Sequence, residues 1–104
     1  MQRRSNVAKS VPINIKYFAA IRDIVEKKEE QIQVGMGTTV EDALNRLTEI
    51  YGERLRSYIY DEKGRLRGNL AILINEESID RERYDRTILK SKDILVILPP
   101  IAGG

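Results

Sequence analysis

One amphipathic segment, Val40 to Tyr51, limits the possible folds of this chain more than any other feature. Its apolar residues fall on a single helical stripe, namely Val40, Ala43, Leu44, Leu47, Ile50 and Tyr51. Thr39 offers an N-cap hydroxyl, with Glu41 or Asp42 completing a capping-box pattern, and Gly52 is placed to end the helix. A helix with one apolar stripe must pack on another element. The strongest patterns elsewhere in the chain are those of β-strands, so we expect a helix on a sheet.

Four segments have strand patterns. Val11 to Phe18 alternates apolar and polar residues, and so does Glu30 to Val34, with a short helical stretch at Ala19 to Val25 between them. Because this connection is short, we expect the two strands to pair as a hairpin. Leu70 to Ile74 and Ile94 to Leu98 are continuous aliphatic runs, which are typical of strands covered on both faces.

The remaining segments have weaker patterns. Glu53 to Gly68 indicates a further turn of helix around Leu55, Tyr58 and Ile59, and then a turn at Asp61 to Gly64. Ile79 is a candidate start for a minor strand. No second domain or repeat is evident, as expected for 104 residues.

The order of these elements predicts an α+β fold with a mixed sheet and one main helix packed across one face, the β-grasp arrangement. The first and last strands would lie side by side in the centre of the sheet, which explains the aliphatic run at Ile94 to Leu98. One face of that last strand would meet the helix. The other would need a partner protein or a neighbouring loop, since a bare aliphatic row is costly in water.

The excess of basic over acidic residues lies at the N-terminal end of the sequence. Residues 1–10 contain Arg3, Arg4 and Lys9 and no acid; without them 18 − 3 = 15 basic residues face 16 acidic ones. We therefore expect a disordered basic tail at 1–10, a folded domain at 11–98 and a flexible tail at 99–104. No apolar run suits a secretory signal or the roughly 20 residues of a membrane span. These features predict a cytoplasmic protein that binds neither nucleic acid nor membrane.

The composition excludes most catalytic chemistry. With no Cys and no His, the chain cannot supply a thiol nucleophile, a Ser-His-Asp triad, the usual zinc site or a disulfide, and we expect neither a metal nor a bound cofactor. The acid pairs Asp23 with Glu26 and Glu41 with Asp42 are better explained as solvated charges.

Two further motifs have ordinary structural explanations. Gly35-Met36-Gly37 lacks the other residues of a phosphate-binding loop, so a turn between a strand and a helix is favoured. A basic group interleaved with acids is better explained as a salt-bridged surface than as a nucleic-acid site; it comprises Arg81, Arg83, Arg86, Lys90 and Lys92.

The end of the chain is the strongest functional candidate. It follows a buried strand and has no charged side chain, with the sequence Leu98-Pro99-Pro100-Ile101-Ala102-Gly103-Gly104. Two terminal glycines would occur by chance in roughly 0.5% of chains, and the Pro-Pro pair favours an extended segment. A glycine carboxylate has no Cβ beside it and can enter a narrow channel. It must be activated before it reacts, and ATP on a partner enzyme would give an acyl-adenylate open to attack by sulfur or an amine.

These residues resemble a known family, the small subunit of molybdopterin synthase, within the ubiquitin-like sulfur carriers that also include the thiamin-pathway carrier. The similarity covers about residues 11–104, and its segments are KYFAAIRD at 16–23, TVEDAL at 39–44, AILIN at 71–75 and SKDILVILPPIAGG at 91–104. The resemblance implies a β-grasp fold and adenylation of Gly104 by an E1-like enzyme that uses ATP. It further implies conversion of Gly104 to a thiocarboxylate and insertion of the tail into a large subunit, where the sulfur passes to a pyranopterin precursor of the molybdenum or tungsten cofactor.

The same resemblance gives the chain the role of a sulfur-donating subunit whose catalytic groups lie on its partners. We expect the large-subunit docking surface to include residues at or next to the strand ends that precede the tail, namely Phe18, Leu98, Pro100 and Ile101. A modifier conjugated to lysines through Gly104, a carrier for another pathway such as thiamin, and a plain interaction module remain as alternatives.

Overall fold

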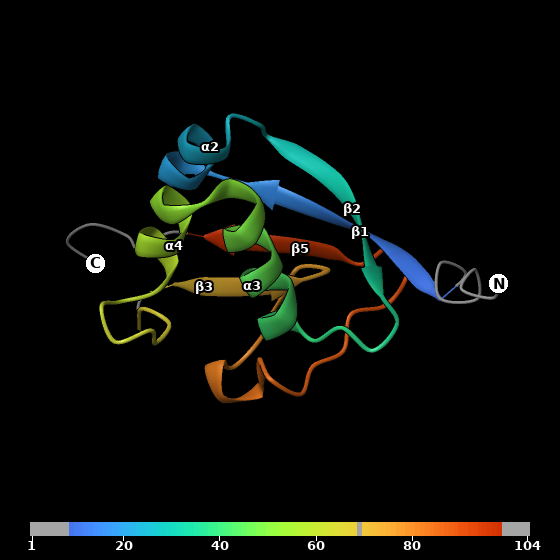
Figure 1. Ribbon diagram of the computed structural model, residues 1–104. Helices are drawn as coiled ribbons and strands as arrows, with labels where there is room; N and C mark the ends of the chain where they lie inside the picture. The colour runs from blue at the N-terminus through green and yellow to red at the C-terminus, as the bar shows by residue number, and fades with distance from the viewer. Residues whose placement is uncertain (1–8, 69, 99–104) are drawn as a thin grey trace, which may run out of the picture.

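The computed structural model describes residues 9–68 and 70–98. Gly104, the predicted tail 99–104 and all but two residues of the predicted tail 1–10 therefore lie outside the described residues. The chain forms one layer of sheet and one of helices (Figure 1), with the elements β1 (Ser10–Tyr17), α2 (Ala19–Val25), β2 (Glu29–Gly35), α3 (Val40–Tyr51), α4 (Glu53–Ile59), β3 (Ala71–Ile74), β4 (Glu77–Ser78), the 3₁₀ helix η1 (Arg81–Arg83) and β5 (Ile94–Leu98).

The sheet has five strands in the order β2-β1-β5-β3-β4. β1 and β5 are parallel, with Tyr17 opposite Ile97, and the other neighbouring pairs are antiparallel. The first and last strands thus lie together in the centre, which confirms the predicted mixed sheet and α+β, β-grasp fold. β1 and β2 pair antiparallel as predicted, but α2 lies in their connection, so the pair is not a tight hairpin.

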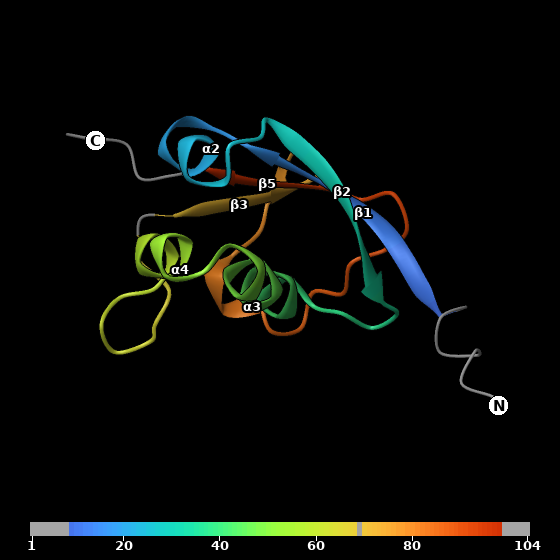
Figure 2. The same ribbon diagram turned by 45° about the horizontal axis from the view of Figure 1, so that its top comes forward.

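α3 begins and ends at the predicted residues. The Thr39 side chain accepts a hydrogen bond from Asp42 N at 3.1 Å, and Asp42 Oδ2 accepts one from Thr39 N at 3.2 Å, which completes a capping box. The helix ends at Gly52, whose φ of +84° suits glycine. α3 and α4 both lie on one face of the sheet (Figure 2).

The core lies between this helical layer and the sheet. Ile13, Ile15, Leu95 and Ile97 point inward from the two central strands and are fully buried. Tyr17, Leu44, Leu47, Leu55, Ile59 and Ile72 join them in the same buried cluster. The helix stripe differs from the prediction at its end, because Ile50 is 50% exposed and Thr48 is buried instead.

The two aliphatic strands are buried on one face only, against expectation. In β5, Leu95 and Ile97 are buried while Ile94, Val96 and Leu98 are half-buried, and in β3 only Ile72 is fully buried. Strand alternation places the half-buried residues on the face opposite α3 and α4. We call this set the outer face; it comprises Ala71, Leu73, Ile94, Val96 and Leu98.

Three other details differ from the sequence prediction. β1 begins at Ser10, one residue before the expected domain boundary, and the minor strand is Glu77–Ser78 rather than a strand starting at Ile79. The sequence predicts a salt-bridged surface for the group Arg81, Arg83, Arg86, Lys90 and Lys92, but within residues 9–68 and 70–98 Arg86 alone of this group forms an ion pair. Arg86 contacts Asp85 at 3.7 Å, whereas Arg81 donates to the Leu66 carbonyl at 2.7 Å.

Candidate functional site at the ends of the central strands

The candidate site lies where β1 and β5 end, side by side at one end of the sheet (Figure 1). Because Tyr17 is opposite Ile97 in a parallel pair, the next residues, Phe18 after β1 and Leu98 at the end of β5, lie side by side at the same end of the sheet. Ala71 of β3 lies opposite Leu98 on its other side. We call Phe18 and Leu98 the exit site, since the chain continues from Leu98 toward Gly104. The other predicted site residues, Pro99, Pro100, Ile101, Ala102, Gly103 and Gly104, lie outside the described residues.

The backbone fixes the position of Phe18. Its own conformation is extended, and its carbonyl accepts hydrogen bonds from Ile21 N at 3.2 Å and Arg22 N at 3.3 Å, which starts α2. Ala19 has a φ of +52°, so the chain turns sharply after Phe18. The ring is 40% exposed, which is unusual for the single Phe of the chain. A large apolar side chain is thus held partly in water beside Leu98.

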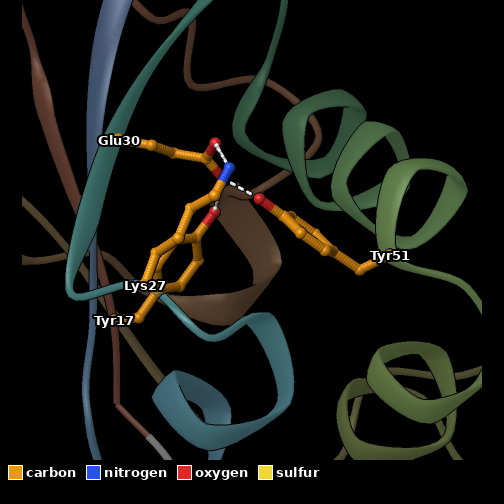
Figure 3. A network of polar contacts seen from close by, with 4 residues as sticks. All are labelled: Tyr17, Lys27, Glu30 and Tyr51. Atoms are coloured by element: carbon orange, nitrogen blue, oxygen red, sulfur yellow. Dashed lines mark hydrogen bonds and ion pairs between the residues drawn. The ribbon is translucent and has the colours of Figure 1, made fainter.

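A cluster of four polar side chains holds the end of β1 in place through Tyr17. Glu30 Oε2 accepts hydrogen bonds from Tyr17 Oη at 2.6 Å and from Tyr51 Oη at 2.5 Å, and Lys27 Nζ donates to Glu30 Oε1 at 2.9 Å. Figure 3 shows these four side chains converging from β1, the α2–β2 connection, β2 and α3. The two rings also pack edge to face, 6.4 Å between centroids. The residue before Phe18 is therefore tied to three other segments.

The electrostatics of this cluster favour a carboxylate and two neutral phenols. Partial burial works to raise the pKa of Glu30, but the hydrogen bonds from Tyr17, Tyr51 and Lys27 outweigh it and hold this pKa below its ordinary value. Burial, and next the hydrogen bond to Glu30, raise the pKa of Tyr17 far above its ordinary value, and the same causes raise the pKa of Tyr51. The cluster is a structural anchor in which every group has a partner.

The exit site continues into the outer face. Leu98 belongs to both. Val96 lies opposite Leu73 in the β3–β5 pair, so the aliphatic side chains of the outer face continue along the sheet from the exit site toward the middle of β5. Sequence reasoning predicted Phe18 and Leu98 but not Ala71, Leu73 or Val96 as their neighbours. The available signal was the aliphatic run of β5. A strand with one buried face needs an apolar side chain only at every second residue, whereas all five residues of β5 are aliphatic.

The described residues offer little else for chemistry. They contain no group of three His, Cys, Asp or Glu side chains that could hold a metal ion. Within 9–68 and 70–98, no helix is long and apolar enough to cross a membrane. The predicted acid pairs do not form a site: Asp42 caps α3, and Asp23, Glu26 and Glu41 are exposed.

Fold and site together define a β-grasp protein whose central last strand leads into a Gly-Gly terminus, the layout of the ubiquitin-like carriers. The chain belongs to the ThiS family, which matches residues 15–104. The molybdopterin synthase sulfur carrier subunit of Drosophila melanogaster is 30% identical to it over 94 residues, covering 90% of this chain and 92% of the relative.

Solved structures of archaeal proteins are also similar. The small archaeal modifier protein 1 of Methanosarcina acetivorans is 34% identical with a TM-score of 0.75, covering 91% of this chain and 98% of that one. SAMP1 of Haloferax volcanii is 25% identical with a TM-score of 0.77, covering 89% and 99%. The family is that of small ubiquitin-like sulfur carriers, and the proteins similar to this chain include both a synthase subunit and modifier proteins.

Proposed function

We propose that this protein is the sulfur-donating small subunit of a molybdopterin synthase and that Gly104 carries the sulfur as a thiocarboxylate. Two things support the proposal: membership of the ThiS family and the similarity to the Drosophila sulfur carrier subunit. The structural observation that carries it is the placement of Leu98 at the end of the central strand, six residues before Gly104, the second residue of the Gly-Gly terminus.

In the proposed reaction the Gly104 carboxylate attacks ATP on an E1-like enzyme, which gives an acyl-adenylate and releases pyrophosphate. Hydrosulfide supplied by a sulfur donor on that enzyme attacks the acyl carbon, AMP leaves, and the thiocarboxylate forms with no change of oxidation state. In the large subunit the thiocarboxylate sulfur attacks a carbon of the pterin precursor and displaces an oxygen substituent from that carbon. Water then cleaves the acyl–sulfur bond, which leaves the sulfur on the pterin and returns the Gly104 carboxylate. The chain itself supplies no Cys or His, so its partners hold the catalytic groups. We place these reactions in the cytoplasm.

The length beyond Leu98 sets a limit on the partners. Six extended residues span at most about 20 Å. A partner's active centre must therefore lie within about that distance of Leu98 when the body of the carrier is docked. This requires a docking surface close to the exit site rather than on the far side of the molecule.

We propose that Phe18, Leu98 and the outer face form that docking surface, together with Pro100 and Ile101. Phe18→Lys should weaken binding to the large subunit at least tenfold, because it replaces a half-exposed ring with a charge that must be desolvated. Ile50→Lys is the matched control, since Ile50 is also a large, partly exposed apolar residue but lies on α3. Equal affinities for the two variants, measured by isothermal titration, would show that the interface lies elsewhere.

The carrier role itself is tested by mass. Incubation with ATP, the activating enzyme and a sulfur donor should raise the mass by about 16 Da, the difference between one sulfur and one oxygen atom. The gain should be absent when Gly103 and Gly104 are deleted. An unchanged mass with an enzyme shown to form the adenylate would overturn the carrier proposal.

Protein modification is the second candidate, and the similarity to small archaeal modifier protein 1 favours it. In that case an amine of a lysine, rather than sulfur, attacks the activated Gly104 and forms an isopeptide bond. Conjugates of higher mass in cells, lost on deletion of Gly103 and Gly104, would support this role. The two roles are compatible, because both begin with the same acyl-adenylate.

A further inference from the structure

The outer edge of β2 is a seven-residue strand edge that has no neighbouring strand within the part of the chain that the structure describes. β2 has seven residues and ends the strand order, so among the described residues β1 is its one neighbour. Both views of the fold show β2 along one border of the sheet (Figures 1 and 2). Such an edge is a template for pairing with another strand.

The pairing with β1 identifies which backbone groups face outward. Tyr17 N donates to Lys28 O at 2.9 Å, and Met36 N donates to Lys9 O at 2.8 Å. Hydrogen-bonded pairs alternate along an antiparallel ladder, so Glu30, Ile32 and Val34 direct their N–H and C=O groups toward β1. The remaining residues, Glu29, Gln31, Gln33 and Gly35, direct theirs away from the sheet.

This edge lacks the usual protection against pairing. Native edge strands are guarded by proline, lysine, a bulge or shortness. β2 has no proline, no lysine and seven residues, and two of its three exposed side chains are the uncharged amides Gln31 and Gln33. Its inward carboxylate, Glu30, already forms an ion pair with Lys27 and accepts hydrogen bonds from two phenols.

The edge is complementary to itself. When two copies of β2 run antiparallel about a two-fold axis at Ile32, Glu29 faces Gly35 of the second copy and Gln31 faces its Gln33. Both pairs join outward-facing residues, which allows about eight backbone hydrogen bonds. No like charges are opposed, and the half-buried Ile32 meets its own copy.

The opposite edge of the sheet prevents growth beyond two copies. β4 has only two residues, and Ile79 N donates to Ile72 O at 3.0 Å, which occupies the neighbouring part of β3. Pairing through β2 therefore gives a closed dimer and not a filament.

We propose that this protein self-associates through its β2 edges into a two-fold dimer with a continuous ten-stranded sheet. β1 separates this edge from β5, so the dimer and the exit site use different parts of the sheet. The contact is small, and the dimer is weak, with a dissociation constant above about 1 µM.

Sedimentation of the full chain tests the proposal. The weight-average mass should rise from monomer to dimer between about 10 µM and 1 mM. Gln31→Pro removes an outward N–H that the monomer does not use, and it should weaken association at least tenfold while the circular dichroism spectrum is unchanged. Gln31→Ala keeps the N–H and should associate as the parent does. A parent that stays monomeric, or a folded Gln31→Pro variant that dimerises normally, overturns the proposal.

A charge exchange tests the same register without proline. Changing Gln31 and Gln33 together to Glu, or together to Lys, opposes like charges in the dimer and should abolish self-association. Mixing the two variants at low salt should restore a heterodimer, because each Glu then faces a Lys. Failure of the mixture to associate, while the parent dimerises, would overturn the register.

Amide exchange identifies the occupant of the edge. The amides of Glu29, Gln31, Gln33 and Gly35 should gain protection as concentration rises. Protection that does not depend on concentration would mean that another segment of the same chain covers the edge, and would overturn the dimer.

Discussion

Glu30→Gln is the substitution that tests the buried polar cluster most directly. It keeps the size of the side chain but removes the charge that accepts three hydrogen bonds, from Tyr17 at 2.6 Å, Tyr51 at 2.5 Å and Lys27 at 2.9 Å. The carboxylate side chain is only 15% exposed, so water replaces little of what is lost. The cluster joins β1, β2 and α3, so its loss should lower the free energy of unfolding of the whole domain.

The expected magnitude follows from the geometry. A hydrogen bond to a charged group contributes about 1.5–3 kcal/mol, and a neutral one about 1 kcal/mol. The amide oxygen of Gln can still accept from the two phenols, so each of these bonds weakens rather than disappears. Lys27 is half-exposed and adds little. We expect Glu30→Gln to lower the free energy of unfolding by about 2 kcal/mol at pH 7.

The pH dependence has a definite sign. The folded-state pKa of Glu30 is held below its ordinary value, so the unfolded chain binds the proton more readily. The stabilisation is therefore complete above the unfolded-state pKa, about 4.3, and is lost as the pH falls through the folded-state value. The gap between the parent and Glu30→Gln should shrink below about pH 4.3, since the variant has no carboxylate at this position.

Urea unfolding followed by far-ultraviolet circular dichroism measures both effects. A change of 2 kcal/mol should move the midpoint by about 1–2 M urea in a domain of this size. Glu29→Gln is the matched control, because Glu29 is the adjacent residue of β2 and is exposed. The reasoning is refuted if Glu30→Gln costs no more than Glu29→Gln, or if its cost is the same at pH 3 and pH 7.

Three further stability changes follow from the fold, each measurable by the same urea titration. Thr39→Ala removes the side-chain half of the α3 capping box and should cost about 0.5–2 kcal/mol, whereas an effect near zero would mean that the cap is not used in solution. Leu44→Ala empties a fully buried position and should cost about 2–5 kcal/mol, far more than Ile50→Ala on the exposed side of the same helix. Gly52→Ala should cost about 1–3 kcal/mol although open space surrounds its Cβ, because φ +84° with ψ −162° is accessible to glycine alone; a neutral result would show that the α3–α4 junction can relax.

The sequence predicts the fold well because each element carries a local signal. The stripe and the capping residues define α3, and the alternation of β1 predicts Ile13, Ile15 and Tyr17 as inward-facing residues, all of which are buried. Where the signal is ambiguous the prediction is wrong. Ile50 and Thr48 lie at opposite borders of the stripe, each about 80° from Val40 around the helix, and the core covers the border with Thr48 and leaves the border with Ile50 exposed.

The polar cluster could not be predicted, because it depends on tertiary placement. Glu30 is separated by 13 residues from Tyr17 and by 21 from Tyr51, and neither spacing has a motif. In the sequence Glu30 is one acid of a charged run. Only the β1–β2 register and the end of α3 bring both phenols to one of its oxygens. The exit site could be predicted from less information. Once the first and last strands are expected to be parallel neighbours, their common end places Phe18 beside Leu98.

The central position of β5 connects the fold to the proposed carrier role. A terminal segment that follows an edge strand would share the fraying of that edge, whereas β5 is bonded on one side to β1 and on the other to β3, with Leu95 and Ile97 fully buried. Such strands open only at free energies near that of global unfolding. The root of the terminal segment is therefore held as firmly as the core itself. For a carrier, the position of Gly104 relative to a docked body then depends on only the six residues that follow Leu98, which is the condition for delivering one sulfur atom to a buried active centre.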